Sequence, residues 1–533
     1  MRHFRNILMI SSAALVLAAC GADDVASPGE GTLVPAPAPS PSPSPSPTPT
    51  PTPGTPATSC ATGFSDAGVV GNYRVCRIPN SINADLTIPA RAGTAYQING
   101  RVDVGIDVGG ATAPRASGRA AVLTIEPGTL IFANGGDADN DFLVVNRGSQ
   151  LQAVGTEARP IIFTARENLT PGGVTDTSQG LWGGIILAGR APISNCNATV
   201  PGGSAGCEAT VEGTGNALYG GELPADSSGR MQYVQIRYSG VAISPNNELQ
   251  GLTTAGAGSG TTISHVQIHN SADDGIEVFG GRNSMRYLVM TGTDDDALDT
   301  DVGHQGAFQF VLAIQRTGNG SSDPRGFEID SNGSEDALPR TDFRVANYTL
   351  VQRLTSTTVA NSAAIHLRGG TDGRLVNGVV AHTANSCLNI DAAQTVRAAD
   401  AALQDNGAPV FNANYFACTL ATGAPTGSTA AIIDDGNVTA AQITAVLTGA
   451  PSSGNVLDGT AAGLTGTFIT AGPAAAVTPF NASTMNFTGS GFLVQTSYIG
   501  AVRDANDIWY RFWTCDSGFA AFGSGSSCTS LPN

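Results

Sequence analysis

The chain has 533 residues, 67 glycines and a formal net charge of −17, although only 13% of its residues are charged and 6% are aromatic. An acidic surface repels the phosphates of nucleic acids and of anionic lipid surfaces, which excludes both as ligands. Loss of Arg2 and Arg5 with the N-terminal signal described next changes the charge from −17 to −19, which suits cations or neutral ligands.

Residues 1–19 have the pattern of an export signal. Two basic residues, Arg2 and Arg5, precede the apolar run ILMISSAALVLAA, which is too short to span a membrane and ends in small residues. The following Leu17-Ala18-Ala19-Cys20 resembles the processing box of bacterial lipoproteins, which implies cleavage before Cys20 and a lipid on that cysteine. Gly21 replaces the Asp that favours inner-membrane retention, so we expect an outer-membrane anchor. The alternative is an ordinary signal peptide with an incidental Cys20.

Residues 20–59 read as a tether rich in Pro, Ser and Thr. Between Pro35 and Pro56 proline recurs at most second positions, which excludes a helix or central strand and favours an extended polyproline II chain. At about 3.1 Å per residue, this stretch would hold the folded body roughly 70 Å from the anchor. A disordered spacer is the alternative.

Eight cysteines follow Cys20. An even number in an exported chain without a Cys-x-x-Cys pair predicts disulfides rather than a metal site. Eight cysteines allow 105 connectivities, and proximity in the sequence favours four local pairs: Cys60–Cys76, Cys196–Cys207, Cys387–Cys418 and Cys515–Cys528.

Residues 60–395 contain a repeat. SHVQIHNSADDGIEVFGG (264–281) aligns with RYLVMTGTDDDALDTDVG (286–303) at an offset of 22 residues, and shorter copies follow as RGFEIDSNG, AAIHLRGG and SCLNID. Short strands at a fixed period, separated by Gly, Asn and Asp, predict an all-β fold, a right-handed parallel β-helix. A β-sandwich has no reason to repeat its sequence at a fixed period.

The repeat sorts side chains into columns on stacked coils, with inward and outward positions alternating along each strand. Two inward columns are predicted: Ile276, Leu298, Phe327, Ile365 and Leu388; and Val278, Thr300, Ile329, Leu367 and Ile390. Two outward columns lie between and beside them: Glu277, Asp299, Glu328, His366 and Asn389; and Phe279, Asp301, Asp330, Arg368 and Asp391.

Five carboxylates of the outward columns form what we call the acid ladder: Glu277, Asp299, Asp301, Glu328 and Asp330. Carboxylates about 5 Å apart repel each other unless a proton, a cation or an arginine neutralises them. Arg368 alone cannot balance five acids. Because Ca²⁺ accepts six to eight oxygen ligands in flexible geometry, we hypothesise that the acid ladder binds Ca²⁺. The alternative is a solvated acidic face with raised pKa values.

The aspartates in front of these strands, at 273–274 and 294–296, are expected to bond the backbone of their turns and to lend further oxygens to the same cation.

Two enzyme templates also fit a β-helix with this face. In a Ca²⁺-dependent polysaccharide lyase, Asp299, Asp301, Glu328 and Asp330 would bind the metal and Arg368 would be the base, so that Asp299, Asp301 and Arg368 are the candidate catalytic residues. A polygalacturonase-like hydrolase would use close aspartates with His and Arg. Here the Asp pair precedes DTD (299–301) instead of following it, and no Arg-Ile-Lys motif occurs.

The pattern changes after Cys387. VRAADAALQD and NVTAAQITAVLTGA have Ala-rich helical spacing, so residues 396–480 are predicted to be an insertion with short helices. Residues 481–533 are aromatic-rich and are expected to cap the open end of the β-helix, whose edge would otherwise pair with other chains. A sugar-stacking platform of Trp509, Tyr510 and Trp513 is the alternative.

Several of these segments resemble a poorly characterised family of bacterial right-handed parallel β-helix surface lipoproteins. The similarity lies in GVAISPNNELQGLTTAGAGSGTTISHVQIHNSADDGIEVFGG, DDDALDTDVGHQG, GFEIDSNGS and YIGAVRDANDIWYRFWTC, and covers roughly residues 120–395 and 490–515. The resemblance implies the fold and a cell-surface location more than an activity.

Taken together, the sequence predicts a non-enzymatic lipoprotein anchored in the outer membrane by its N-terminal lipid and facing the cell surface. Its acidic face would bind a polysaccharide or a surface protein, with Ca²⁺ as a structural or bridging ion and no other cofactor. The alternatives are a tethered polysaccharide lyase or glycoside hydrolase acting at the same face, and a structural accessory of an outer-membrane receptor or surface layer. The sequence sets no oligomeric state.

Overall fold

The computed structural model describes residues 54–134, 140–244, 247–317, 324–331, 333–353 and 363–531. The predicted signal peptide, Cys20 and nearly all of the tether lie outside the described residues, so the lipid anchor stays a prediction. Among the described residues, no helix has the length and apolar character needed to cross a membrane.

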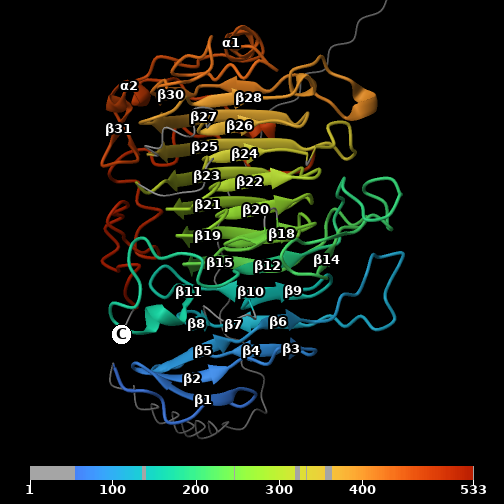
Figure 1. The fold of residues 1–533 in the computed structure, drawn as a ribbon, viewed down its shortest axis with the longest axis vertical. Helices are drawn as coiled ribbons and strands as arrows, with labels where there is room; N and C mark the ends of the chain where they lie inside the picture. The colour runs from blue at the N-terminus through green and yellow to red at the C-terminus, as the bar shows by residue number, and fades with distance from the viewer. Residues whose placement is uncertain are drawn as a thin grey trace, which may run out of the picture. The chain divides into compact units, whose positions relative to one another are not determined.

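The body is a parallel β-helix built from two sheets (Figure 1). Both sheets are parallel apart from β1, which pairs antiparallel with β2. Sheet 1 contains 16 strands: β1 (Ser65–Val70), β2 (Tyr73–Arg77), β4 (Leu86–Ile88), β5 (Thr94–Ile98), β7 (Val122–Ile125), β8 (Leu130–Ala133), β10 (Gln150–Val154), β11 (Ile161–Ala165), β15 (Gly229–Arg237), β19 (Thr262–His269), β21 (Ser284–Thr291), β23 (Ala307–Ile314), β25 (Asp342–Gln352), β27 (Asp372–His382), β29 (Val410–Asn412) and β30 (Tyr415–Cys418). Sheet 2 contains ten strands: β3 (Ser81–Ile82), β6 (Arg101–Val104), β9 (Phe142–Val145), β12 (Ile185–Ala188), β18 (Leu252–Ala255), β20 (Ile276–Phe279), β22 (Leu298–Asp301), β24 (Phe327–Ile329), β26 (Ile365–Leu367) and β28 (Leu388–Ile390).

The remaining elements are short. Three small hairpins pair β13 (Ala209–Thr210) with β14 (Leu218–Tyr219), β16 (Val241–Ser244) with β17 (Asn247–Leu249), and β31 (Leu464–Thr465) with β32 (Ile469–Thr470). The helices are α1 (Ala440–Thr448) and α2 (Gly472–Ala475), with 3₁₀ turns at Arg166–Leu169, Ala393–Thr395, Ala401–Leu403, Ala461–Gly463 and Ala482–Met485.

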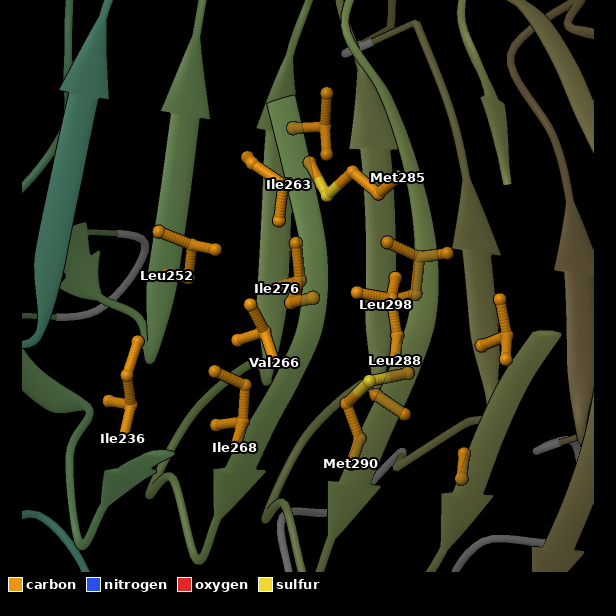
Figure 2. Packing of buried hydrophobic residues seen from close by; sticks show 14 of the residues in the cluster. Ile236, Leu252, Ile263, Val266, Ile268, Ile276, Met285, Leu288, Met290 and Leu298 are labelled. Carbon is orange, nitrogen blue, oxygen red and sulfur yellow. The ribbon is translucent and has the colours of Figure 1, made fainter. Parts of the chain in front are cut away.

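The 22-residue register is confirmed. Ile276 pairs with Leu298 between β20 and β22, and Ser264 pairs with Arg286 between β19 and β21. Both predicted inward columns are fully buried and form the core between the sheets, part of which Figure 2 shows. Each buried aliphatic side chain of this kind stabilises the fold by about 1.5–3 kcal/mol. The β-helix predicted from the period is therefore correct, including Thr300 as the one polar residue of its inward columns.

The long strands of sheet 1 bend at a column of residues in the left-handed conformation: Tyr233 (φ 52°), His265 (55°), Tyr287 (58°), Phe310 (60°), Asn347 (53°) and Asn377 (56°). Non-glycine residues rarely adopt a positive φ. Here the repetition on successive coils aligns the side chains, so that neighbouring rings from Tyr233 to Phe310 stack with centroids 4.5–4.7 Å apart.

Residues 481–531, which we call the C-terminal segment, lie along this bend instead of capping the end of the β-helix. The side chain of Asn347 donates to the carbonyl of Tyr498 at 3.0 Å, and that of Gln267 donates to the carbonyl of Cys515 at 3.1 Å. The red chain in Figure 1 follows sheet 1 toward β11 accordingly. The structure differs from the predicted cap because the side chains at the bend offer a row of amides and rings to which the segment binds.

The aromatic platform considered as an alternative is also not formed. Tyr510 and Trp513 are buried in an apolar cluster with Leu312 and Phe468, so neither ring is available to a sugar.

The end of the β-helix is covered by part of residues 396–480. The first strands of this range, β29 and β30, continue sheet 1 and pair with β27. Ile432 then bridges to Leu388 of sheet 2, and Ile443 and Leu447 of α1 join the core. The predicted short helices are present, but this region completes and closes the β-helix rather than interrupting it.

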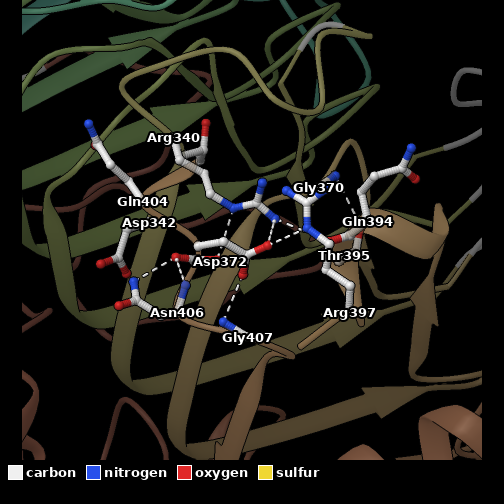
Figure 3. Close-up of polar contacts among 12 residues, drawn as sticks. Arg340, Asp342, Gly370, Asp372, Gln394, Thr395, Arg397, Gln404, Asn406 and Gly407 are labelled. Atoms are coloured by element: carbon white, nitrogen blue, oxygen red, sulfur yellow. Dashed lines mark hydrogen bonds and ion pairs between the residues drawn. The ribbon is translucent and has the colours of Figure 1, made fainter. Parts of the chain in front are cut away.

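Covalent and ionic links hold these parts together. All four predicted disulfides are present: Cys60–Cys76, Cys196–Cys207, Cys387–Cys418 and Cys515–Cys528. Figure 3 shows a buried network in which Arg340 bonds Asp372 at 3.0 Å and Asp405 at 3.2 Å. Arg397 reaches Asp405 at 2.6 Å, so the network fixes the start of residues 396–480 to β25 and β27.

Candidate metal centre and acidic face

Neighbouring strands of sheet 2 bring the acid ladder together as the repeat predicts. Glu277 of β20 pairs with Asp299 of β22, which pairs with Glu328 of β24. His366 and Asn389 continue the column on β26 and β28. The second column places Asp301 beside Asp330, with Arg368 on the next coil.

The acid ladder is not the solvated face that was the alternative to a Ca²⁺ site. The chain between β12 and β15 packs Ile193, Val211 and Tyr219 against the outer side of sheet 2, where Phe279 lies. As a result Glu277 is only 7% exposed and Asp301 only 8%. Burial of a charge without compensation is costly, so these carboxyls need protons, bases or a cation.

The turn aspartates bond backbone amides, as expected, but Asp274 and Asp296 bond those of the next coil instead of those of their own turns. Gln250 Oε1 accepts from the amide of Asp274, Asp274 Oδ1 from that of Asp296, and Asp296 Oδ1 from that of Arg325, at 3.3, 2.9 and 2.7 Å. Asp294 pairs with Arg316 and accepts from Gln179. Asp274 and Asp296 therefore have a structural role in each turn, with oxygens left for other partners.

Two sets of carboxylate oxygens converge at the end of the acid ladder that lies beside the turns before β20 and β22. We call this the turn end of the acid ladder. Within each set the oxygens lie within 4.8 Å of one another, and Asp274 belongs to both. We call their members the carboxyl cluster: Asp273, Asp274, Glu277, Asp295 and Asp299. In the part of the chain that the structure describes, Glu277 Oε2 and Asp299 Oδ1 are buried without a hydrogen-bond partner.

The electrostatics of this cluster are unfavourable to ionisation. Burial, followed by the charges of Asp295 and Glu248, raises the pKa of Asp273 to about 8. Burial and neighbouring carboxylates also raise the pKa values of Asp274, Glu277 and Asp299 well above the ordinary range. No basic residue is a main influence on Asp273, Asp274 or Glu277. Either protons or a cation must neutralise this end of the acid ladder.

The other end of the acid ladder, at Glu328 and Asp330, is already neutralised by arginine side chains. Arg368 contacts Glu328 at 2.8 Å and Asp330 at 3.2 Å, and Arg325 pairs with Glu328. Burial opposes ionisation of Glu328, but nearby His366, whose Nδ1 lies 3.6 Å from a carboxylate oxygen, and the charge of Arg325 outweigh it and lower the pKa of Glu328. Of the five predicted metal ligands, Glu277 and Asp299 thus belong to the carboxyl cluster, whereas Glu328 and Asp330 are held by arginine.

Asp301 lies between these two ends. Burial and the charge of Asp330 raise its pKa to about 7, while one of its oxygens accepts a hydrogen bond from the amide of Val302 at 2.7 Å.

Sequence reasoning missed two acids beside the cluster, Glu212 and Glu248. Glu212 accepts from Gln250 at 2.9 Å, and burial together with the charge of Glu248 raises its pKa to about 7. Both come from segments between coils, outside the 22-residue repeat, so no periodic signal marks them. The converging oxygens are hard ligands of the type that Ca²⁺ prefers, and the residues present fit such an ion.

The comparisons with known proteins agree with this architecture. The family model described as pectate-lyase like beta helix domain matches residues 111–453. Because the match spans more than half of the chain, the protein belongs to this family. No curated protein and no solved structure matches it. The matched range contains the whole acid ladder and the coils on both sides of it, and this fold is compatible with polysaccharide binding or lyase chemistry.

Proposed function

We propose that this protein is an exported, lipid-anchored β-helix that binds an acidic polysaccharide through Ca²⁺ held by the carboxyl cluster. One observation carries the proposal: among the described residues, Glu277 Oε2 and Asp299 Oδ1 are buried without a hydrogen-bond partner in a cluster of converging carboxyls. A pectate-lyase-like β-helix is a suitable scaffold for such a ligand.

Calcium would join the protein to its ligand. The ion accepts six to eight oxygens, and Asp274, Glu277 and Asp299 each offer one oxygen within the same 4.8 Å set. The remaining coordination positions of the ion suit carboxylate or hydroxyl oxygens of a polysaccharide. Arg368, whose side chain is 42% exposed at the far end of the acid ladder, is already paired with Glu328 and Asp330 and would contact the polymer through its remaining N–H donors.

A tethered polysaccharide lyase at the same face is the second candidate, because the family fold accommodates it. In that case Arg368 would be the base, with Asp299 and Asp301 at the metal. Burial lowers the pKa of Arg368, but the charges of Asp330 and Glu328 outweigh this and raise it above its ordinary value. A guanidinium held protonated by two acids is a poor proton acceptor but can still donate hydrogen bonds to a polymer, which favours the binder.

Calcium titration of the chelator-treated mature protein tests the metal site. We expect a saturable heat of binding that Asp299→Asn removes and that the matched variant Asp330→Asn, on the arginine-neutralised end, retains. Absence of heat in the wild type would exclude the metal site, and equal loss in both variants would place it elsewhere.

A panel of acidic polysaccharides, with and without Ca²⁺, tests the ligand. We expect Ca²⁺-dependent binding without new products. The appearance of unsaturated sugar absorbance would show that the protein is a lyase and not only a binding protein. New reducing ends without that absorbance would show that it is a hydrolase.

The anchor and the location are tested on cells. Cys20→Ser should abolish incorporation of a labelled fatty acid, and protease treatment of intact cells should remove the body. Full protection from protease would place the protein inside the outer membrane.

A further inference from the structure

A recess of about 420 Å³ lies on sheet 1, between the first halves of β19 and β21 and the loop at residues 490–492. Its volume is within the range of about 300–1,000 Å³ that small-molecule sites occupy. Half of its lining residues carry an aliphatic hydroxyl group. The residues used below are Thr262, Ser264, Ser284, Arg286, Ser490 and Phe492.

The recess has a positive character in a strongly acidic chain. No Asp or Glu lines it, and Arg286 is its one charged lining residue. Burial and the charge of Arg286 lower the pKa of the neighbouring His265 to about 4, so this imidazole is neutral near pH 7. A single guanidinium among neutral hydroxyl groups is suited to an anion carried by a polyhydroxylated molecule.

Arg286 is positioned but not neutralised. Its guanidinium carbon lies 4.3 Å from the centroid of the Phe492 ring, a cation–π contact. Among the described residues the structure shows no ion pair for this guanidinium, whereas Arg344, two strands further along the same sheet on β25, pairs with Asp342 and lies over Phe487. The N–H donors of Arg286 are therefore free for a ligand.

The walls of the recess are preorganised. On one side His265 is stacked between Tyr233 and Tyr287, each at 4.5 Å. On the other side, Asn486 closes the loop that carries Ser490 and Phe492 through two hydrogen bonds of 2.8 Å with the backbone of Leu493. Preformed walls reduce the entropy lost on binding.

We propose that this recess is a second, metal-independent binding site for an acidic sugar residue, with Arg286 on its carboxylate or sulfate group and the serine and threonine hydroxyls on its hydroxyl groups. The inference shares the ligand class of the proposed function but neither its residues nor its metal, because the recess is on sheet 1 and the carboxyl cluster is on sheet 2. Two sites on different sheets would let one molecule hold two segments of a polymer and so gain avidity.

Binding of defined oligosaccharides to the full mature protein in excess chelator tests this site. The probes are an oligogalacturonate, a sulfated galactan oligomer and a neutral galactan oligomer of equal length. We expect one of the two anionic probes to bind, the neutral probe to bind at least about tenfold more weakly, and added salt to weaken the interaction. Equal binding of the neutral probe, or no binding of either anionic probe, would overturn the proposal.

Two variants of Arg286 test whether its guanidinium binds the anionic probe. Arg286→Met should weaken binding of the anionic probe at least about tenfold, the size of one lost charge-assisted contact, and Arg286→Lys should retain part of it. Arg503→Met is the matched control, because Arg503 also lies over a ring, that of Tyr498, but outside the recess. Unchanged binding in Arg286→Met with an unaltered melting temperature would refute the site.

The test of the recess on sheet 1 can be distinguished from the test of the calcium-dependent site in the proposed function. Asp299→Asn should remove calcium-dependent binding and leave binding in chelator intact, whereas Arg286→Met should do the reverse. Loss of both activities in either variant would show a single site and would contradict the inference.

Discussion

Asp301 contributes a defined part of the pH dependence of stability in the metal-free protein. Its carboxyl is 8% exposed, and burial followed by the charge of Asp330 raises its pKa from 3.8 to about 7. In the unfolded chain the same group ionises near its ordinary value. The folded state, which keeps the proton, therefore loses stability as the pH rises from about 4 to about 7.

The size of this loss follows from the two pKa values. At about 1.36 kcal/mol per pKa unit, the rise from 3.8 to about 7 corresponds to about 4 kcal/mol, of which about 3 kcal/mol lies between about pH 5 and about pH 8. Asp301→Asn removes the titrating group, while the amide oxygen can still accept the hydrogen bond from Val302. The difference in free energy of unfolding between the variant and the wild type should therefore grow by about 3 kcal/mol in favour of the variant between pH 5 and pH 8.

Urea denaturation of chelator-treated protein at these two pH values measures the effect. Asp66→Asn is the control, because Asp66 is exposed and the backbone hydrogen bond from Gly68 lowers its pKa. A lowered pKa contributes stability above the ordinary value, so Asp66→Asn should gain nothing at pH 8. Parallel pH profiles for the wild type and Asp301→Asn would refute the reasoning.

Three further predictions concern other parts of the structure. Asp299→Asn should abolish the rise in melting temperature that Ca²⁺ gives the wild type, and Asp330→Asn should preserve it; the reverse result would exclude the carboxyl cluster as the metal site. Arg340→Met should lower the free energy of unfolding by about 3–5 kcal/mol, because it leaves the buried carboxylate of Asp372 without its arginine and removes one of the two arginines paired with buried Asp405; a change below about 1 kcal/mol in urea denaturation would contradict this. Trp513→Ala should cost about 3–5 kcal/mol and release the C-terminal segment to limited proteolysis, because the ring packs against Tyr233 and His265; unchanged resistance to protease would contradict the docking described above.

The repeat made the fold and much of the site predictable. Residues 22 apart become neighbours on adjacent coils, so the pairing of Glu277 with Asp299 could be read from the period alone. The same logic predicted the buried columns, and proximity in the sequence was enough to pair the cysteines.

Contacts made outside the repeat could not be predicted in this way. The apolar chain around Tyr219 covers the acid ladder and has no fixed spacing to the strands that it meets. Arg325 lies only three residues before Glu328, but the aligned positions of the two earlier copies, Asp274 and Asp296, hold no arginine, so the repeat does not predict this pair. The C-terminal segment was misplaced for a related reason: its partners, such as Gln267 and Asn347, lie about 150 to 250 residues earlier in the chain. Composition revealed its aromatic character but not the surface that buries it.

A crystal structure of the protein soaked in Ca²⁺, or in a lanthanide that scatters anomalously, tests the central claim most directly. The account predicts an ion at the turn end of the acid ladder, bound by Asp274, Glu277 and Asp299. An ion bound instead between Glu328 and Asp330, or a carboxyl cluster that stays free of metal at saturating Ca²⁺, would contradict it.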